Sequence, residues 1–230
     1  MVSHKYKCIF IHIPKTGGET VASLFDNEDS NIPKHANARQ IKSFLGEKVW
    51  AKYFKFTVVR NPYDMAVSMY SHLRKPLYQQ EVIKKKYGKK VLNPVKACAT
   101  ACNNSFKNYC VEVFKEKQVQ DEELRQSWPV SYFQNQTDWI TVDQDKIKLD
   151  FVIRYENLNK DLSYVLDNLN ITYTEIPNKN ISKHNHYSKY YTKQTKNIVA
   201  QHYQKDLEYL EYFFEDEKNL FDKIKILFKQ

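Results

Sequence analysis

The sequence predicts an α/β fold, in which short parallel strands form a sheet with helices packed against it. Residues 54–59, Phe-Lys-Phe-Thr-Val-Val, are nearly all apolar or β-branched, as expected of a strand buried in a parallel sheet. Short runs of this kind, over residues 7–13, 54–59 and 150–154, alternate with stretches of helical spacing. This alternation is typical of strand–helix–strand units.

The first predicted unit is a strand over residues 7–13, a tight turn at Gly17 and Gly18, and a helix to about Phe25. Only four of the 230 residues are glycine, so an adjacent pair marks a place where the backbone turns tightly or approaches another group closely. A tight turn that carries Lys and Thr before a helix N-terminus suits an anion, because backbone N–H groups and the positive end of the helix dipole converge there. Residues 15–20 are therefore predicted to bind phosphate or sulfate.

A second unit follows, with a helix over residues 36–45 that Gly46 ends and a strand over residues 54–59. After this strand, Asn61 suits the N-cap of a helix and Pro62 suits its first position.

Arg60 follows this strand directly, at the sheet edge where open α/β sheets bind ligands. Its planar guanidinium suits a second phosphate, and Ser68, two turns into the helix, supplies a hydroxyl for the same group. The alternative for Arg60 is a salt bridge to Asp64 or another carboxylate. Anion sites at two neighbouring strand ends indicate a ligand with phosphates at both ends of a nucleoside.

Residues 77–126 have the weakest pattern, and we expect them to form a helical insertion or lid within a single domain over residues 1–230. Helical stretches in that segment are predicted near residues 78–87 and 106–117. The later predicted elements are a strand over 150–154, a helix from Tyr155 to Leu169, a polar loop over 178–191, an amphipathic helix over 195–214 and a final helix that ends near Phe228.

Composition bounds the partners and the compartment. The formal net charge is +9, which favours anionic partners without choosing among them. No apolar run approaches the roughly 20 residues of a membrane-spanning helix, and no signal peptide follows Met1, so we expect a soluble, cytoplasmic protein.

The four cysteines do not form a Cys-x-x-Cys pair, and no histidine cluster completes a zinc pattern. Cys8 is expected in the core. Cys98, Cys102 and Cys110 could form a disulfide, but free thiols are the default in a reducing compartment.

The glycine turn departs from the common nucleotide-binding loops. In a Walker A loop the lysine follows the last glycine and a Ser or Thr then holds Mg²⁺, whereas here Lys15 precedes Gly17 and Gly18. The order is not G-x-G-x-x-G either. We therefore expect a different phosphate-binding loop that works without a metal ion.

Two motifs carry a resemblance to a known family. Residues 11–20, Ile-His-Ile-Pro-Lys-Thr-Gly-Gly-Glu-Thr, resemble the 5′-phosphosulfate-binding motif of sulfotransferases, and residues 56–68 resemble their 3′-phosphate-binding motif. Two further stretches are similar to the carbohydrate branch, which includes heparan sulfate 2-O-sulfotransferase-like enzymes and soluble bacterial relatives. They are residues 151–158 and a tyrosine-rich tail, which comprises Tyr187, Tyr190, Tyr191 and the helix through Tyr203 and Asp206. The resemblance implies a P-loop-NTPase-like parallel sheet flanked by helices, the sulfotransferase fold.

The resemblance also implies the chemistry. The donor would be 3′-phosphoadenosine 5′-phosphosulfate (PAPS), and the acceptor a hydroxyl of a carbohydrate or similar small molecule. Lys15 would neutralise charge on the leaving oxygen. Glu19 departs from the family pattern, because many members have Ser or Thr at this position. A carboxylate beside the anionic donor would repel the donor, so the Glu19 side chain must point away from it. The implied donor-binding residues are Lys15, Thr16, Gly17, Gly18, Glu19, Thr20, Arg60 and Ser68.

A hydroxyl acceptor needs a base, and histidine serves near neutral pH. His35 is the candidate, because it lies in the polar loop where related enzymes place a catalytic histidine; the alternative is an ordinary surface histidine. His184 and His186 are rivals, whereas His12 and Glu156 are expected to be structural.

Residues 136–139, Gln-Thr-Asp-Trp, resemble a family segment near the acceptor cleft, where Trp139 would be a sugar platform or, as we favour, a core residue.

Two other functions remain open from the sequence. One is a nucleotide kinase-like P-loop enzyme, which needs Mg²⁺ and the Walker A lysine. The other is a non-catalytic module that binds polyanions through basic and aromatic residues. Nucleic acid is not the expected partner, and the oligomeric state is left open.

Overall fold

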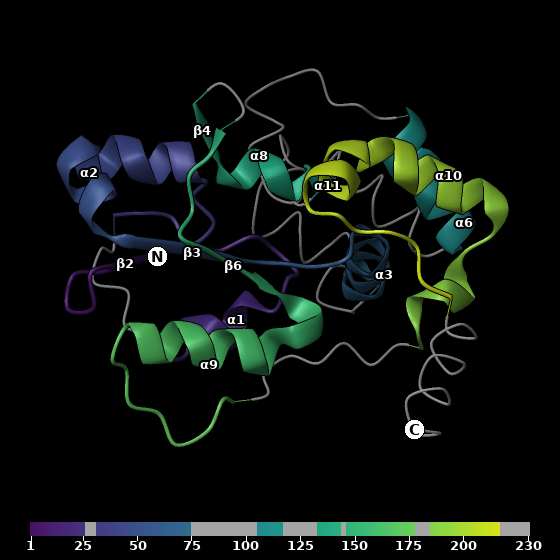
Figure 1. Cartoon of the computed structure of the whole chain (residues 1–230). Helices are drawn as coiled ribbons and strands as arrows, with labels where there is room; N and C mark the ends of the chain where they lie inside the picture. Colours follow the sequence, from purple (N-terminus) through teal and green to yellow (C-terminus); the bar gives the residue numbers. More distant parts are fainter. Residues whose placement is uncertain (26–30, 75–104, 117–132, 144–145, 178–184, 217–230) are drawn as a thin grey trace, which may run out of the picture. The chain divides into compact units, whose positions relative to one another are not determined.

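Three of the predicted strands lie side by side in the central sheet of the computed structural model (Figure 1), which describes residues 1–25, 31–74, 105–116, 133–143, 146–177 and 185–216. The chain divides into two compact units. We call residues 1–60 with 134–181 the sheet unit, and residues 61–133 with 182–230 the helical unit.

The sheet has the strand order β1-β2-β3-β6, with β1 at Val2–Ser3, β2 at Cys8–Ile11, β3 at Phe54–Val59 and β6 at Phe151–Arg154. Strands β2, β3 and β6 are parallel, and β1 is antiparallel to β2. Phe56 lies opposite Phe10 on one side and Phe151 on the other. The predicted parallel strands are thus confirmed, whereas the two-residue strand β1 is too short to give a sequence pattern.

Helices cover both faces of this sheet. Figure 1 shows α2 (Ala38–Lys52) on one face and α1 (Gly18–Ala22) and α9 (Leu158–Asn168) on the other. A 3₁₀ turn, η4 (Tyr155–Asn157), leads from β6 into α9. Apolar side chains between the sheet and α9 form a core in which Phe10 stacks on Phe56 with ring centroids 5.2 Å apart. Its buried residues include Cys8, Val21, Val58, Ile153, Leu162, Val165 and Leu166.

Two helices in this unit differ in extent from prediction. Helix α1 ends at Ala22 rather than near Phe25. Gly46 interrupts the helix as predicted: its φ of 76° is non-helical and kinks the chain, and a second helical segment that the sequence did not predict follows as far as Lys52. The second segment buries Trp50, which is 3% exposed, so packing continues the helix beyond the glycine.

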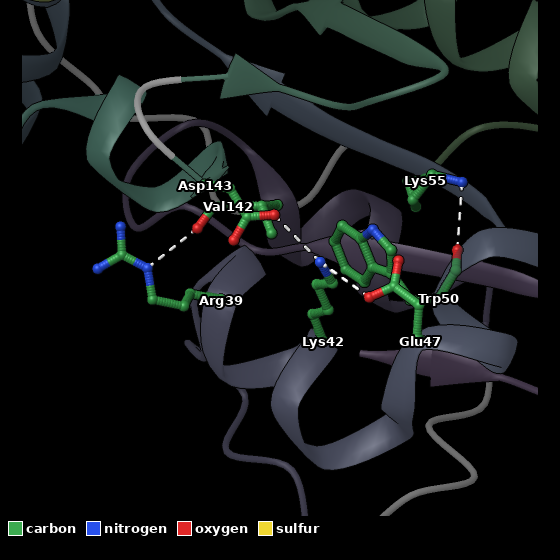
Figure 2. Close-up of polar contacts among 7 residues, drawn as sticks. All are labelled: Arg39, Lys42, Glu47, Trp50, Lys55, Val142 and Asp143. Atoms are coloured by element: carbon green, nitrogen blue, oxygen red, sulfur yellow. Dashed lines mark hydrogen bonds and ion pairs between the residues drawn. The ribbon is translucent and has the colours of Figure 1, made fainter.

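Helix α2 is also tied to a small hairpin of β4 (Thr141–Asp143) and β5 (Lys146–Ile147), which follows α8 (Gln136–Ile140). The Arg39 Nε donates to the Val142 carbonyl at 3.2 Å, and the Lys42 ammonium lies 3.0 Å from Glu47 and 3.1 Å from Asp143 (Figure 2). The bonds from Arg39 to Val142 and from Lys42 to Asp143 join segments about a hundred residues apart in the sequence.

The helical unit packs aromatic side chains around α3 (Pro62–Leu73). Its other elements are α6 (Phe106–Cys110), a π-helical segment η2 (Val111–Glu116), η5 (Tyr187–Tyr190), α10 (Lys193–His202) and α11 (Gln204–Tyr209). Asn61 caps α3 by accepting from the Tyr63 amide at 3.1 Å, and Pro62 is its first residue, as predicted.

The prediction of one continuous helix over residues 195–214 is wrong. The observed helix starts at Lys193, after a capping box at Thr192, and breaks at Tyr203 into α10 and α11. The Tyr203 ring is 1% exposed and packs on Phe114 at 5.5 Å between centroids. Tertiary packing of this ring therefore outweighs helical periodicity.

Cys8 and Cys110 are buried free thiols, and burial raises the pKa of Cys110 far above its usual value. Cys98, Cys102 and most of the predicted insertion over residues 77–126 lie outside the described residues. Among the helices in the described ranges, none is long and apolar enough to cross a membrane.

The N-terminal cap of α2 gives a stability prediction. Asn37 accepts from the Gln40 amide at 2.9 Å, and the Gln40 side chain accepts from the Asn37 amide at 2.9 Å. Asn37→Ala should lower the free energy of unfolding by about 1 kcal/mol, measured by urea denaturation. Ser43→Ala, an exposed change within α2, is the control and should cause no loss. Equal stability of both variants would contradict the role of the cap.

Candidate active site

The loop after β2 is wound tightly through left-handed backbone conformations. Lys15 has a φ of 67° and Gly17 a φ of 89°. The buried Thr16, between these two residues, donates its hydroxyl to the Ile13 carbonyl at 2.9 Å. Further along, the Thr20 amide donates to the Gly17 carbonyl at 3.0 Å. A left-handed lysine is uncommon, and such residues gather at binding sites. The Thr16 hydroxyl therefore shapes the loop.

The two glycines lie against aromatic rings. A Cβ at Gly17 would be 2.8 Å from Cδ2 and 2.9 Å from Cε2 of Tyr155, and a Cβ at Gly18 would overlap the ring of His12. Gly18 is buried at the start of α1. Both positions therefore require glycine for packing inside the protein, whether or not a ligand approaches the backbone.

Arg60 reaches from the end of β3 to this loop. It is 4% exposed, and its Nη1 donates to the Lys15 carbonyl at 3.1 Å. The guanidinium carbon lies 4.1 Å from the centroid of the Tyr155 ring, in a cation–π arrangement. The basic residues of the two sequence motifs are thus brought together, and Tyr155 contacts both Arg60 and Gly17.

Gln136 holds the backbone of Arg60. It is fully buried; its Oε1 accepts from the Arg60 amide at 2.8 Å and its Nε2 donates to the Arg60 carbonyl at 2.8 Å. This pair of bonds imitates a strand neighbour at a point where β3 has ended. Trp139, from the same helix, is 5% exposed, so the favoured expectation of a core residue is confirmed.

The geometry of His35 sets its tautomer. Its Nδ1 is 3.0 Å from the His12 carbonyl oxygen, and a carbonyl only accepts hydrogen bonds, so Nδ1 carries the proton and Nε2 the lone pair. Burial lowers the pKa of His35 below 6.5, although the bond to His12 and the charge of Glu19 oppose that shift. At neutral pH the ring is therefore uncharged, as a base requires.

The side chain of His12 packs against Gly18 and His35. Its ring stacks on Phe10 at 5.3 Å and lies 4.5 Å from the ring of His35. Burial, and then the neighbouring His35 and Lys34, lower the pKa of His12 to about 2. Its Nδ1 has no hydrogen-bond partner within the described part of the chain. His12 is thus a neutral ring that contacts both Gly18 and His35.

The side chain of Glu19 is held by a lysine. The Lys34 ammonium lies 2.6 Å from Glu19 Oε1, and both side chains are nearly half exposed. Lys34 immediately precedes His35. This ion pair joins the first turn of α1 to the loop that carries the candidate base.

The remaining predicted residues belong to other elements. Ser68 belongs to the helical unit, where it is buried in α3. His186 belongs to the same unit and stacks on Tyr187 at 4.6 Å, and its Nδ1 bonds the Ser188 hydroxyl. His184 lies outside the described residues, and Glu156 is exposed in η4. Within the described ranges, no cluster of three His, Cys, Asp or Glu side chains could hold a metal ion.

Comparison with known proteins bears on the whole chain. The model of the sulfotransferase family matches residues 1–223. The chain belongs to the sulfotransferase family. No curated protein and no solved structure matches it. As a sulfotransferase, the chain is an enzyme that transfers a sulfuryl group to an acceptor. The α/β unit with its mainly parallel sheet is consistent with the sulfotransferase fold.

Sequence reasoning did not assign Tyr155, Gln136 and Lys34 their positions around the glycine loop. Tyr155 and Gln136 come from segments more than seventy residues after Arg60. The one available signal was Glu19, whose carboxylate beside an anion site requires a compensating cation.

The glycine packing gives a second prediction. Gly18→Ala should lower the free energy of unfolding by about 1–3 kcal/mol, because its methyl overlaps the His12 ring. In the double variant His12→Ala/Gly18→Ala the ring is gone, so the loss should be smaller than the sum of the single losses. Urea denaturation of the four proteins measures both. Strict additivity would contradict the contact.

Proposed function

We propose that this sulfotransferase moves a sulfuryl group from PAPS to a hydroxyl of a carbohydrate or a similar small hydroxylated acceptor, without a metal ion. The observation that carries the proposal is the bond from Arg60 to the Lys15 carbonyl, which brings together the two sequence motifs that resemble the 5′- and 3′-phosphate sites. Membership of the family supports the reaction type.

In this proposal the loop from Lys15 to Thr20 is P-loop-like and holds the 5′-phosphosulfate. Backbone amides of Thr16, Gly17, Gly18 and Glu19 and the Thr20 hydroxyl bind its oxygens, and the Lys15 ammonium stabilises the charge on the leaving phosphate oxygen. Arg60 and Ser68 hold the 3′-phosphate. The family match spans both compact units, which supports a single domain over residues 1–230 with residues 77–126 as an insertion or lid.

His35 is the proposed general base. The bond from sulfur to the acceptor oxygen forms as the bond from sulfur to the bridging phosphate oxygen breaks. The acceptor proton passes to His35 Nε2, whose lone pair the hydrogen bond at Nδ1 preserves. The imidazolium that forms lies near the carboxylate of Glu19, whose charge raises the pKa of His35.

The acceptor class rests on the resemblance of residues 151–158 and of the tyrosine-rich tail to the carbohydrate branch. We assign the chain to that branch, whose heparan sulfate 2-O-sulfotransferase-like enzymes act on sugar hydroxyls. Seven histidines and a net charge of +9 suit a base-assisted reaction on anionic sugars.

Removal of Lys15 tests the donor site. Lys15→Ala should lower kcat by about 10²–10³-fold with folding retained, because the leaving oxygen loses its stabilising charge. The assay is transfer of radiolabelled sulfate from PAPS to a panel of glycans, phenols and lipids. Lys48→Ala, an exposed change in α2, should retain full activity. Calorimetric titration should show binding of adenosine 3′,5′-bisphosphate but not of ATP with Mg²⁺. Normal transfer by Lys15→Ala would refute the assignment.

The state of His35 predicts the pH profile. Burial lowers the folded pKa of His35, so the base stays neutral to a lower pH than a free histidine does, and kcat should fall only as the pH drops through that lowered pKa. His35→Gln should reduce kcat by about 10²–10⁴-fold and abolish this acid limb. His4→Gln, which changes an exposed histidine, should leave the profile intact. An acid limb that persists in His35→Gln would assign the base role to another residue.

A further inference from the structure

We propose that Lys34 is a positioning residue that holds the Glu19 carboxylate and cancels its charge, so that a glutamate can stand beside the donor-binding loop. This inference rests on the proposed function, since it needs an anionic donor at residues 15–20. Lys34 would therefore control donor affinity without contacting the donor.

The ion pair has the geometry for this role. Glu19 follows Gly18 directly and is the acidic residue in the first turn of α1. The Lys34 Nζ donates to its Oε1 at 2.6 Å, which commits one carboxylate oxygen to the lysine. The carboxylate is thereby held on the side of the loop 33–36.

The exposure of the pair argues against a purely structural role. The side chains of Lys34 and Glu19 are 46% and 44% exposed, and ion pairs this accessible contribute little to stability. Their effect on a multiply charged anion bound at the adjacent loop would be larger, because each unpaired charge acts on every phosphate and sulfate group. Lys34 variants should therefore fold normally and differ in binding.

The same pair borders the candidate base. Lys34 precedes His35, whose Nδ1 is fixed by the His12 carbonyl. The charge of Lys34 lowers the pKa of His35 and the charge of Glu19 raises it, so the two members of the pair act on His35 in opposite directions. Of the other groups that face His35, the His12 carbonyl, which accepts its Nδ1 proton, raises the pKa of His35, and the amino group of Met1 lowers it.

The direction in which each variant changes the affinity for the nucleotide follows from the charges of Lys34 and Glu19. Lys34→Ala leaves an uncompensated carboxylate by the loop and should weaken binding of adenosine 3′,5′-bisphosphate about 3- to 10-fold at low salt, and less at high salt. Lys34→Ala/Glu19→Gln removes both charges and should restore the affinity to within about 2-fold of the parent. Lys34→Arg keeps the pair and should match the parent.

The experiment is calorimetric titration of the full chain and these variants with adenosine 3′,5′-bisphosphate at low and high salt. Lys48→Ala is the control for loss of one surface lysine, and thermal unfolding checks that each variant is folded. In the transfer assay, Lys34→Ala should raise KM for PAPS with kcat nearly unchanged, and its acid limb should move to higher pH.

Each outcome decides one of the two proposals. If the parent protein does not bind the nucleotide, the proposed function fails. If the parent binds it and Lys34→Ala binds as tightly as Lys48→Ala, Lys34 has no positioning role. If Lys34→Ala binds weakly and Glu19→Gln does not rescue it, Lys34 contacts the donor directly and the inference is overturned.

Discussion

The candidate site depends on one buried cation. The Arg60 guanidinium has almost no access to water, so its N–H groups must find acceptors within the protein or in a bound ligand. It donates to the Lys15 carbonyl and lies on the face of Tyr155, which itself closes over Gly17. Gln136 bonds both the N–H and the carbonyl of Arg60, so the backbone that carries the guanidinium is held in place within the protein itself. Such preorganised donors are the means by which enzymes stabilise developing negative charge.

His12 and His35, unlike Arg60, are held in the uncharged state. His12 is packed between Phe10, Gly18 and His35, an environment in which an imidazolium is strongly disfavoured. Its backbone carbonyl nevertheless orients His35 by accepting the Nδ1 proton. One residue thus supports the glycine loop with its side chain and the candidate base with its backbone. The glycine loop and His35 therefore both depend on His12, which directly follows β2 at the start of the loop.

Glu19 shows how a local conflict in a sequence can be resolved at a distance. A carboxylate in the proposed phosphate-binding turn is unfavourable by itself. Lys34 removes this conflict from a segment fifteen residues later, through an exposed ion pair that costs the fold little. The sequence indicated that the Glu19 side chain had to be directed elsewhere, but it did not reveal the partner.

Local sequence alone was sufficient for the strands at residues 7–13, 54–59 and 150–154 and for the Asn61–Pro62 helix start, because apolar runs and caps are encoded by neighbouring residues. The continuation of α2 past Gly46 and the break at Tyr203 arose from burial of Trp50 and Tyr203, which depends on distant segments. The positions of Tyr155 and Gln136 around Arg60, and of His12 against His35, likewise followed only from the sheet, because β2, β3 and β6 lie far apart in the chain. Short-range patterns specify elements, whereas contacts between elements are decided by packing of the whole chain.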